Sequence, residues 1–463
     1  MDNVMAVILA AGQGKRMRSR LPKVMHRICG KPLLKFVYDA LDTAGIKKMV
    51  AVVGYGSEHI ESYFREEKVK IEYARQQEQL GTGDAVRSAS AFFGDFAGRV
   101  IIINGDLPMI KPASITGLLE HNADHADAAT VVSARLQNPF GFGRIIRRPD
   151  SGLDRIAEQR DAADDELAIN EINTGIYCFD IKYLVEALAE LKNDNAQKEF
   201  YLTDTIGILS SRGINVGVYE LSDSEESLGA NDREELSRLG ALTRRRICSE
   251  LMTKGGVTII DPENSYIDLS VEIQPDTTIY PGCVIEGNTH IGAGCIIGPY
   301  TRIVNSVIED NVRIENSVLT EALVRKNTKI GPFAYLRPGT VLGENVKVGD
   351  FVELKNSIIG DGTKIPHLSY VGDADVGTGT NIGCGVITCN YDGRKKYRTI
   401  IGDNVFVGSN ANLVAPVTVN SGAYVASGST ITEDVPERAL SVARSRQVNK
   451  EGWVEKREKK VKE

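Results

Sequence analysis

The sequence has little of what marks membrane, secreted or nucleic-acid-binding proteins. No apolar run is long enough to cross a bilayer, since the first one, "VMAVILAAG", soon reaches a glycine turn. The seven cysteines are scattered and contain no CxxC pair, which favours neither a zinc site nor a disulfide framework. Acidic residues (62) outnumber basic ones (55), so the charge of −7 argues against a nucleic-acid partner. We therefore expect a soluble protein of the reducing cytoplasm, without a signal peptide or membrane contact.

The chain changes its pattern near its middle. Before that point, short β-branched segments such as "MAVILA", "KMVAVVG" and "RVIIING" alternate with helical ones such as "KPLLKFVYDALDTAG". This alternation predicts an α/β fold, Rossmann-like, with a mostly parallel sheet covered by helices. An apolar stripe over 231–254 predicts one helix, which the Gly255-Gly256 pair ends. We expect a first domain at 1–228, a linker helix at 229–256 and a second domain at 257–463.

The second half repeats with a period of six. Aliphatic residues keep this spacing in three runs: Ile273, Ile279, Ile285, Ile291, Ile297 and Ile303; Leu336, Leu342, Val348 and Leu354; Ile401, Val407, Leu413, Val419, Val425 and Ile431. A hexapeptide repeat is typical of a parallel β-helix, in which each hexapeptide forms one face of a triangular coil. Because the outer faces of such a coil are flat, we expect it to pack against copies of itself.

The stretch "ILAAGQGKRMRSRLPKVMH" follows the first predicted strand. Gly12 and Gly14 would let the backbone approach a ligand, and Arg16 and Lys23 add positive charge for a polyphosphate. A dinucleotide-binding loop fits poorly, because Met17 stands where a third glycine is needed, and the P-loop pattern is absent. A plain strand-to-helix turn remains the alternative to a phosphate site.

Several motifs together resemble the sugar-nucleotide pyrophosphorylases: "LAAGQGKRM", "LPK", "QQEQLGTGDAV", "NGDLP", "NPFGFGRI", "AEQRDA", "EINTGIY" and "GANDR". With the hexapeptide half attached, nearly the whole chain resembles the bifunctional bacterial N-acetylglucosamine-1-phosphate uridyltransferase/glucosamine-1-phosphate acetyltransferases. This resemblance implies a left-handed coil, a homotrimer, and synthesis of UDP-N-acetylglucosamine. The implied substrates are glucosamine 1-phosphate and acetyl-CoA, then N-acetylglucosamine 1-phosphate and UTP.

For the first half, "RVIIINGD" predicts a buried strand that brings Asp106 to the carboxyl edge of the sheet, where Mg²⁺ could bind. The resemblance implies that Asn231 is the second metal ligand, although this residue could also be a helix N-cap. It gives Arg16 and Lys23 catalytic roles, and it implies a UTP and UDP-N-acetylglucosamine site at Leu9, Ala10, Ala11, Gly12, Lys23, Gln76, Gly81, Thr82, Asn104, Gly105, Asp106, Gly141, Glu158, Asn173 and Asn231. One departure is Lys15, where the family usually has threonine.

For the coil, Arg337 and Lys355 lie eighteen positions apart, which is one full turn, so they should stack about 4.8 Å apart. They could clamp a phosphate or form an exposed charged ladder. His367 is the predicted general base, because imidazole titrates near neutral pH, and Glu353 could orient it. The resemblance implies a glucosamine-phosphate site at Arg337, Lys355, Tyr370, Asn381, Asn390 and Tyr391. It implies an acetyl-CoA site at Cys384, Asn390, Tyr391, Ser409, Ser427 and Arg444, with Cys384 where alanine is usual.

The repeat is interrupted at "GVITCNYDGRKKY", between Ile382 and Ile401. We expect a loop there, with its turn at Asp392-Gly393 and with Arg394 to Lys396 providing positive charge near phosphates. Two alternatives remain open: a pyrophosphorylase whose coil serves only for oligomerisation, and a non-catalytic scaffold built from the same two domains.

Overall fold

The computed structural model describes residues 3–94, 96–150 and 152–462. The chain packs into two compact units, one up to Thr243 and one from Arg244 onward. The division falls inside helix α8 (Arg233–Thr253), so the helix expected over 231–254 is present. The predicted boundaries after residues 228 and 256 stay predictions, and their outer limits at residues 1 and 463 lie outside the described residues.

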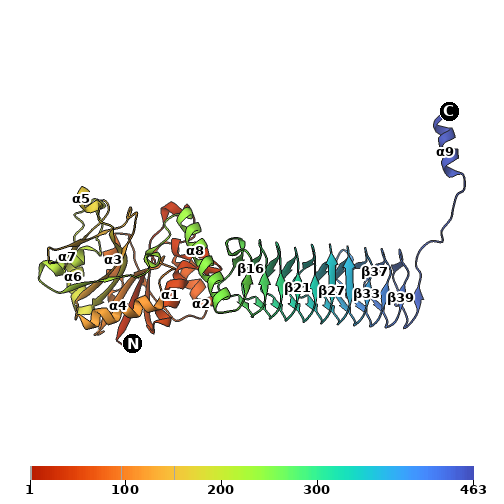
Figure 1. The fold of residues 1–463 in the computed structure, drawn as a ribbon, viewed down its shortest axis with the longest axis horizontal. Helices are drawn as coiled ribbons and strands as arrows, with labels where there is room; N and C mark the ends of the chain where they lie inside the picture. The colour runs from red at the N-terminus through yellow and green to blue at the C-terminus, as the bar shows by residue number, and fades with distance from the viewer. Residues whose placement is uncertain (1–2, 95, 151, 463) are drawn as a thin grey trace. The chain divides into compact units, whose positions relative to one another are not determined.

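The first unit is built on a nine-stranded sheet with helices on both faces (Figure 1). Its main path is β11-β7-β10-β6-β1-β4-β5, in which β10 is antiparallel to both neighbours and the other pairs are parallel. The strands are β1 (Val4–Leu9), β4 (Lys48–Val53), β5 (Glu72–Arg75), β6 (Arg99–Asn104), β7 (Ala129–Arg135), β8 (Arg144–Arg147), β9 (Leu153–Ala157), β10 (Glu171–Asp180) and β11 (Val216–Glu220). The expected mostly parallel sheet is confirmed.

The pleat of each central strand divides its side chains between two cores. In β1, Ala6 and Ile8 join the core beneath α1 (Leu33–Thr43), α2 (Ser57–Glu66) and α4 (Pro112–Asp124), whereas Met5 and Val7 join the opposite one. The opposite core contains side chains from α3 (Thr82–Ser88), α6 (Ile181–Glu190) and α7 (Asp204–Ser211). Burial on both faces explains why these strands read as continuous apolar runs.

The second unit is a left-handed parallel β-helix of stacked hexapeptides (Figure 1). Its first sheet contains β12 (Thr258–Ile259), β15 (Thr278–Ile279), β18 (Ile296–Ile297), β21 (Arg313–Ile314), β24 (Lys329–Ile330), β27 (Lys347–Asp350), β30 (Lys364–His367), β33 (Asn381–Ile382), β36 (Phe406–Val407), β39 (Tyr424–Val425) and β41 (Leu440–Ser441). Its second sheet contains β13 (Tyr266–Ile267), β16 (Val284–Glu286), β19 (Arg302–Val304), β22 (Val318–Thr320), β25 (Tyr335–Leu336), β28 (Glu353–Lys355), β31 (Tyr370–Gly372), β34 (Ile387–Cys389), β37 (Asn412–Val414) and β40 (Thr430–Ile431). Its third sheet contains β14 (Glu272–Ile273), β17 (His290–Ile291), β20 (Val307–Ile308), β23 (Leu323–Val324), β26 (Val341–Leu342), β29 (Ile358–Ile359), β32 (Ala374–Val376), β35 (Thr399–Ile401) and β38 (Val417–Val419).

The six-residue period sets the register of this coil. Ile273 pairs with Ile291, and Leu336 pairs with Leu354, one full turn later in each case. These side chains are buried, as the repeat predicts. The interruption, however, is shorter than expected. The period continues through Thr388, which is buried and pairs with Leu413, so only the segment from about 390 to 398 leaves the coil.

Thr388 stands at an inward position where the other coils carry an aliphatic residue. Its hydroxyl donates to the Gly372 carbonyl (3.0 Å) and accepts from the Gly372 amide (2.8 Å). Because the chain is about to leave the coil, this hydroxyl supplies an acceptor to the neighbouring strand. The loop then closes at Asp392, whose carboxylate accepts from the amides of Arg394 and Lys395, as the Asp-Gly turn predicts.

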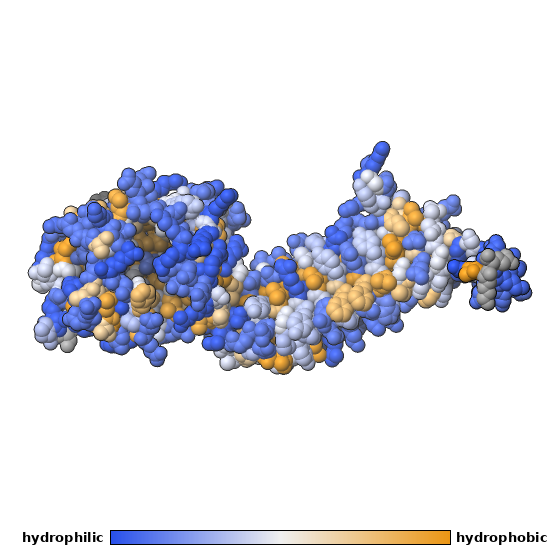
Figure 2. All heavy atoms as spheres, turned by 90° about the horizontal axis from the view of Figure 1, so that it is seen from above, coloured by the Kyte–Doolittle hydropathy of each residue, from blue (hydrophilic) through white to orange (hydrophobic). Residues whose placement is uncertain are grey.

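An apolar column runs along the outer face of the third sheet. Val307, Leu323, Val341 and Ile358 follow one another on successive turns, and the exposed fractions of Val307 and Ile358 are 45% and 52%. Hydrophobic side chains lie among hydrophilic ones along the coil in Figure 2. The chain ends in α9 (Trp453–Lys462), and none of the described helices has the length and apolar character to cross a membrane.

Candidate active sites

The first unit contains a pocket of about 1,020 Å³ at the carboxyl edge of its sheet. The ends of β1 and β6 meet there, because Leu9 pairs with Asn104. The pocket brings together nearly all of the residues predicted for the nucleotide and sugar: Leu9, Ala10, Ala11, Gly12, Arg16, Lys23, Gln76, Gly81, Thr82, Asn104, Asp106, Gly141, Glu158, Asn173 and Asn231. Gly105 does not line it and instead packs against Leu34 and Leu9, where a Cβ atom would meet both. Lys15 does not line it either.

The glycines of the first loop serve two purposes. Gly14 has a φ of +63°, and a Cβ atom there would lie 2.7 Å from Cβ of Lys23. This glycine therefore lets the lysine stem pass close to the loop. Gly12, in contrast, has open space where its Cβ would be and lines the pocket, which leaves room for a ligand against the backbone.

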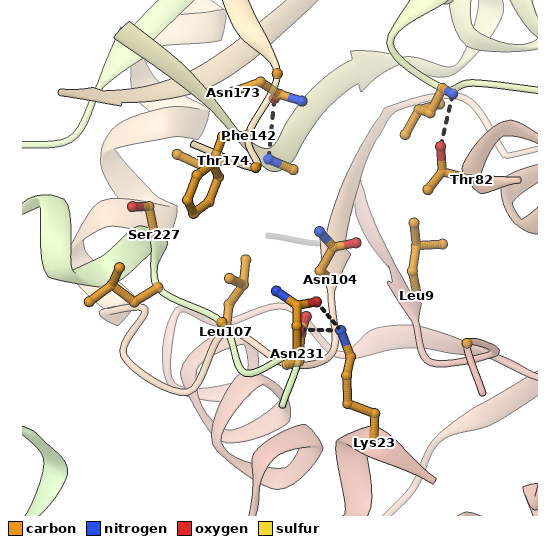
Figure 3. Close-up of a pocket in the computed structure, with 18 of the residues that line it drawn as sticks. Leu9, Lys23, Thr82, Asn104, Leu107, Phe142, Asn173, Thr174, Ser227 and Asn231 are labelled. Atoms are coloured by element: carbon orange, nitrogen blue, oxygen red, sulfur yellow. Dashed lines mark hydrogen bonds and ion pairs between the residues drawn. The ribbon is translucent and has the colours of Figure 1, made fainter. Parts of the chain in front are cut away.

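A polar triad lies at the floor of the pocket. The Lys23 ammonium contacts the Asp106 carboxylate at 2.6 Å and the Asn231 side-chain oxygen at 3.3 Å. Figure 3 shows Lys23 reaching up toward Asn231 from the lower side of the pocket. Residues from three distant segments thus present two oxygens to one cation.

Asn231 is not the helix N-cap. The side chain of Asp232 accepts from the amides of Glu234 and Glu235, so Asp232 caps α8 instead. Glu235 in turn accepts from the Asn231 backbone amide (2.6 Å). The side chain of Asn231 is therefore free to face the pocket, and the alternative reading of this residue as a cap is wrong.

The opposite end of the pocket is more buried. Glu158 accepts from the Thr203 hydroxyl (3.0 Å), and burial raises the pKa of Glu158, with nearby Asp204 acting in the same direction. Asn173 donates to the Tyr177 hydroxyl (2.7 Å), and burial also raises the pKa of that phenol. This end offers neutral and weakly acidic hydrogen-bonding groups, which suit the hydroxyls of a sugar.

Gln76 is tied to the protein at the nucleotide end. Its amide nitrogen donates to the Asp84 carboxylate (2.8 Å) and to the Gly81 carbonyl (3.2 Å). The amide donor of Gln76 is therefore engaged within the protein, and the side chain helps to hold the loop that carries Gly81 and Thr82.

On the coil, His367 lies one turn above Asp350. The two residues are paired in β30 and β27, and His367 Nδ1 is 2.6 Å from Asp350 Oδ1. The His367 hydrogen bond lowers the pKa of Asp350. Glu353, predicted to orient the histidine, is instead paired with Arg337 at 2.9 Å, because its side chain projects from the second sheet beside that cation.

Arg337 and Lys355 occupy successive turns, as predicted. Each has a carboxylate partner: Glu353 for Arg337, and Asp373 for Lys355 at 3.4 Å. Carboxylates of the protein itself therefore offset the repulsion between the two cations. Lys396, from the loop, joins them: its side-chain contact with Lys355 lowers the pKa of Lys396, and Arg337 acts in the same direction.

Asp373 ties this cation group to the loop. Burial favours the neutral carboxyl, but hydrogen bonds from Asn356 and Asn390 and the charge of Lys355 hold the pKa of Asp373 below its ordinary value. Asn390 also donates to the Tyr370 hydroxyl at 3.4 Å. Tyr391 points elsewhere: its side chain is exposed and its hydroxyl donates to the Gly393 carbonyl (2.7 Å).

Three of the residues predicted for acetyl-CoA follow strands of the first sheet on later turns. The Cys384 carbonyl accepts from the Asn410 amide, and the Ser409 carbonyl accepts from the Gly428 amide, which aligns Cys384, Ser409 and Ser427 in one column. At the end of this column, the Arg444 side chain lies 4.0 Å from the position that a Cβ atom on Gly428 would take. Asn381 lies on the first sheet, paired with Lys364.

Comparison with known proteins decides the family. A protein named Bifunctional protein GlmU from Acetivibrio thermocellus is 52% identical over 457 residues, covering 99% of this chain and 98% of that relative. The chain belongs to the bifunctional GlmU family. GlmU proteins from Brevibacillus brevis and Clostridium kluyveri are 49% and 48% identical, covering 100% and 98% of this chain and 99% and 98% of their own lengths.

Family models agree with the two units of this GlmU-family chain. The model described as Nucleotidyl transferase matches residues 5–224, and the bacterial transferase hexapeptide model (six repeats) matches residues 270–305. A third, the GMPPB C-terminal domain, matches residues 318–440. The chain is therefore a bifunctional transferase, for which the family implies small-molecule substrates, a divalent metal and oligomerisation through the coil.

The triad at the pocket floor fits such a metal. The oxygens of Asp106 and Asn231 already converge on one cation, the ammonium of Lys23. Among the described residues, no group of three or more histidine, cysteine or acidic side chains forms a fuller cage. A hard ion that keeps several waters and completes its shell with substrate phosphates fits these two oxygens.

Sequence reasoning missed several residues in these sites. In the pocket these are Phe140, Phe142, Tyr177, Thr203, Glu235 and Arg238, and on the coil they are Asp350 and Asp373. The repeat could have predicted Asp350, because this residue lies one turn before His367. The pocket residues come from segments whose spacing in the sequence carries no such signal.

Proposed function

We propose that this chain makes UDP-N-acetylglucosamine in two steps. The coil transfers the acetyl group of acetyl-CoA to the amine of glucosamine 1-phosphate. The first unit then transfers the uridylyl group of UTP to the resulting N-acetylglucosamine 1-phosphate and releases pyrophosphate. The observation that carries this proposal is the His367–Asp350 pair at the end of the first sheet, together with the Arg337 and Lys355 cations on the second sheet, because a coil used only for oligomerisation needs neither.

In the uridylyl step, the sugar phosphate attacks the α-phosphorus of UTP. Arg16 and Lys23 would neutralise the charge that develops on the phosphates. Asp106 and Asn231 would hold Mg²⁺, which supplies further charge neutralisation when bound. Glu158 and Asn173, at the buried end, would orient the sugar hydroxyls and acetamido group, so that positioning contributes much of the rate.

In the acetyl step, Arg337, Lys355 and Lys396 would bind the phosphate of glucosamine 1-phosphate. Tyr370 and Asn390, which are hydrogen-bonded to each other, would contact the sugar. The column of Cys384, Ser409 and Ser427 would accept the pantetheine arm, with Arg444 near the phosphates of CoA. His367 would take the proton from the attacking amine.

We also propose that the protein is a cytoplasmic homotrimer. The exposed apolar column of Val307, Leu323, Val341 and Ile358 is the kind of surface that a second copy would bury. Light scattering coupled to size exclusion tests this: three times the mass of one chain is expected, and a monomer at micromolar concentration contradicts it.

The function is tested by two separate assays on the purified protein. With glucosamine 1-phosphate and acetyl-CoA, we expect release of free CoA. With N-acetylglucosamine 1-phosphate, UTP and Mg²⁺, we expect release of pyrophosphate. Pyrophosphate release without CoA release would favour the single-activity pyrophosphorylase, and the absence of both would favour a scaffold.

A further inference from the structure

The contact between His367 and Asp350 joins two successive turns of the coil. The residues are register partners at the end of adjacent parallel strands, and the ring nitrogen Nδ1 lies 2.6 Å from the carboxylate oxygen. A carboxylate accepts hydrogen bonds and does not donate them, so Nδ1 must carry the hydrogen. The other ring nitrogen, Nε2, is then the one with a free electron pair.

Among the charged groups near His367, Asp350 is the one whose contact with the ring joins the two turns. On the strand below, Lys347 acts on Asp350 and lowers the pKa of that carboxyl together with the His367 hydrogen bond. On the strand that carries the histidine, the exposed Lys364 points out of the first sheet. On the turn above, Cys384 occupies the matching position, and on the second sheet Glu353 is paired with Arg337.

We propose that Asp350 is a positioning residue for acetyl transfer, which holds the reactive tautomer of His367 and stabilises its charged form. This inference rests on the proposed acetyltransferase function. In this proposal Asp350 does not contact the substrate. It acts through the ring, in the way that a buried or half-buried carboxylate orients the histidine of other acyl-transfer sites.

In acetyl transfer, the amine nitrogen of glucosamine 1-phosphate forms a bond to the thioester carbonyl carbon of acetyl-CoA, and Nε2 of His367 takes the proton that the nitrogen loses. The carbon–sulfur bond then breaks, its electron pair goes to sulfur, and the imidazolium returns the proton to give the free thiol of CoA. Between these events the ring is positively charged, and the Asp350 carboxylate lies against it.

The test compares Asp350→Asn and Asp350→Ala with the unchanged chain. Asparagine keeps an oxygen acceptor for Nδ1 but removes the charge, whereas alanine removes both. We expect kcat for CoA release to fall about tenfold with asparagine and further with alanine, while KM for glucosamine 1-phosphate stays within twofold.

The controls separate this inference from the function on which it rests. Glu344→Gln removes an exposed carboxylate from the coil without touching this pair and should leave kcat and KM for CoA release unchanged. Pyrophosphate release should be equal in all variants, which checks folding. If the unchanged chain releases no CoA, the proposed function fails; if it does, and Asp350→Asn keeps kcat within twofold, the inference about Asp350 is wrong.

Discussion

The two units of this chain build their sites in opposite ways. In the first, loops from distant parts of the sequence enclose a pocket, and Lys23, Asp106 and Asn231 meet only because the sheet brings their segments together. In the second, side chains one turn apart form an open wall, and Asp350 and His367 meet because the repeat sets their register. The first site depends on tertiary packing, and the second depends on the register that the six-residue repeat sets between successive turns.

This difference predicts how each site responds to substitution. In the pocket, one side chain often holds another, so a change spreads to its neighbours, as with Glu235 and Asn231. On the wall, each turn is held by its own backbone ladder and aliphatic core, so a change should stay local. The following variants test that contrast.

The largest effect is expected at the floor of the pocket. Asp106→Ala removes the carboxylate that Lys23 contacts and that we propose as a metal ligand. Pyrophosphate release should fall by about a thousandfold, since charge stabilisation of phosphoryl transfer is lost. Release of CoA should not change. Asp165→Ala, which alters an exposed carboxylate of the same unit, is the matched control; a similar loss in both variants would contradict the proposed role.

A smaller effect is expected on the wall. Lys355→Met removes one cation of the proposed phosphate clamp while the Arg337–Glu353 pair remains. A hydrogen bond to a charged group contributes about 1.5–3 kcal/mol, so KM for glucosamine 1-phosphate should rise roughly ten- to a hundredfold. The exposed Lys329→Met controls for lost surface charge. An unchanged KM would mean that the phosphate binds elsewhere.

At the buried end of the pocket, one substitution of Glu158 should raise stability and weaken sugar binding. Because burial raises the pKa of Glu158, folding favours its protonated form. That contribution to stability is present at low pH and is lost as pH rises through the pKa of the folded state. Glu158→Gln is neutral at every pH, so it should melt at a higher temperature than the unchanged chain at pH 8, with the difference shrinking toward pH 4.

The same variant should bind sugar more weakly. The KM for N-acetylglucosamine 1-phosphate is expected to rise about tenfold, because a charged acceptor is lost. Glu120→Gln, at an exposed position of α4, should change neither quantity. A lower melting temperature at pH 8 for Glu158→Gln would contradict this, since it would mean that the folded protein stabilises the ionised Glu158 carboxylate.

The smallest effect concerns the coil where the loop leaves it. Thr388→Val keeps the shape of the side chain but removes the partner of the Gly372 amide. An unsatisfied buried donor costs about 1–3 kcal/mol, which a lower urea midpoint for unfolding of the coil would report. Thr320→Val, at a half-exposed outward position, should stay within about 0.5 kcal/mol. No shift at Thr388 would mean that the strand finds another acceptor.

The contrast also explains what the sequence could predict. The repeat predicted the coil, the stacking of Arg337 on Lys355 and the inward aliphatic residues, because a fixed period converts position into contact. It did not predict the carboxylates that pair with these cations, since Glu353 and Asp373 look like ordinary polar residues of a turn or strand. Thr388 was overlooked for a related reason: a polar residue at an inward position breaks the pattern, although its hydroxyl satisfies the neighbouring strand.

In the first unit, the sequence predicted the sheet and, through resemblance, most of the residues that line the pocket. It could not assign their local partners. Whether Asn231 or Asp232 caps α8 depends on side-chain direction, and the engagement of Gln76 with Asp84 depends on how α3 packs against the sheet. Such details follow from tertiary structure and have no counterpart in spacing.

A pair of assays on His367→Ala gives the sharpest test of the two-site proposal. CoA release should fall at least a hundredfold, because the proposed general base is lost, while pyrophosphate release should stay within twofold of the unchanged chain. Retention of CoA release, or loss of both activities in a variant that unfolds at the same temperature as the unchanged chain, would contradict it.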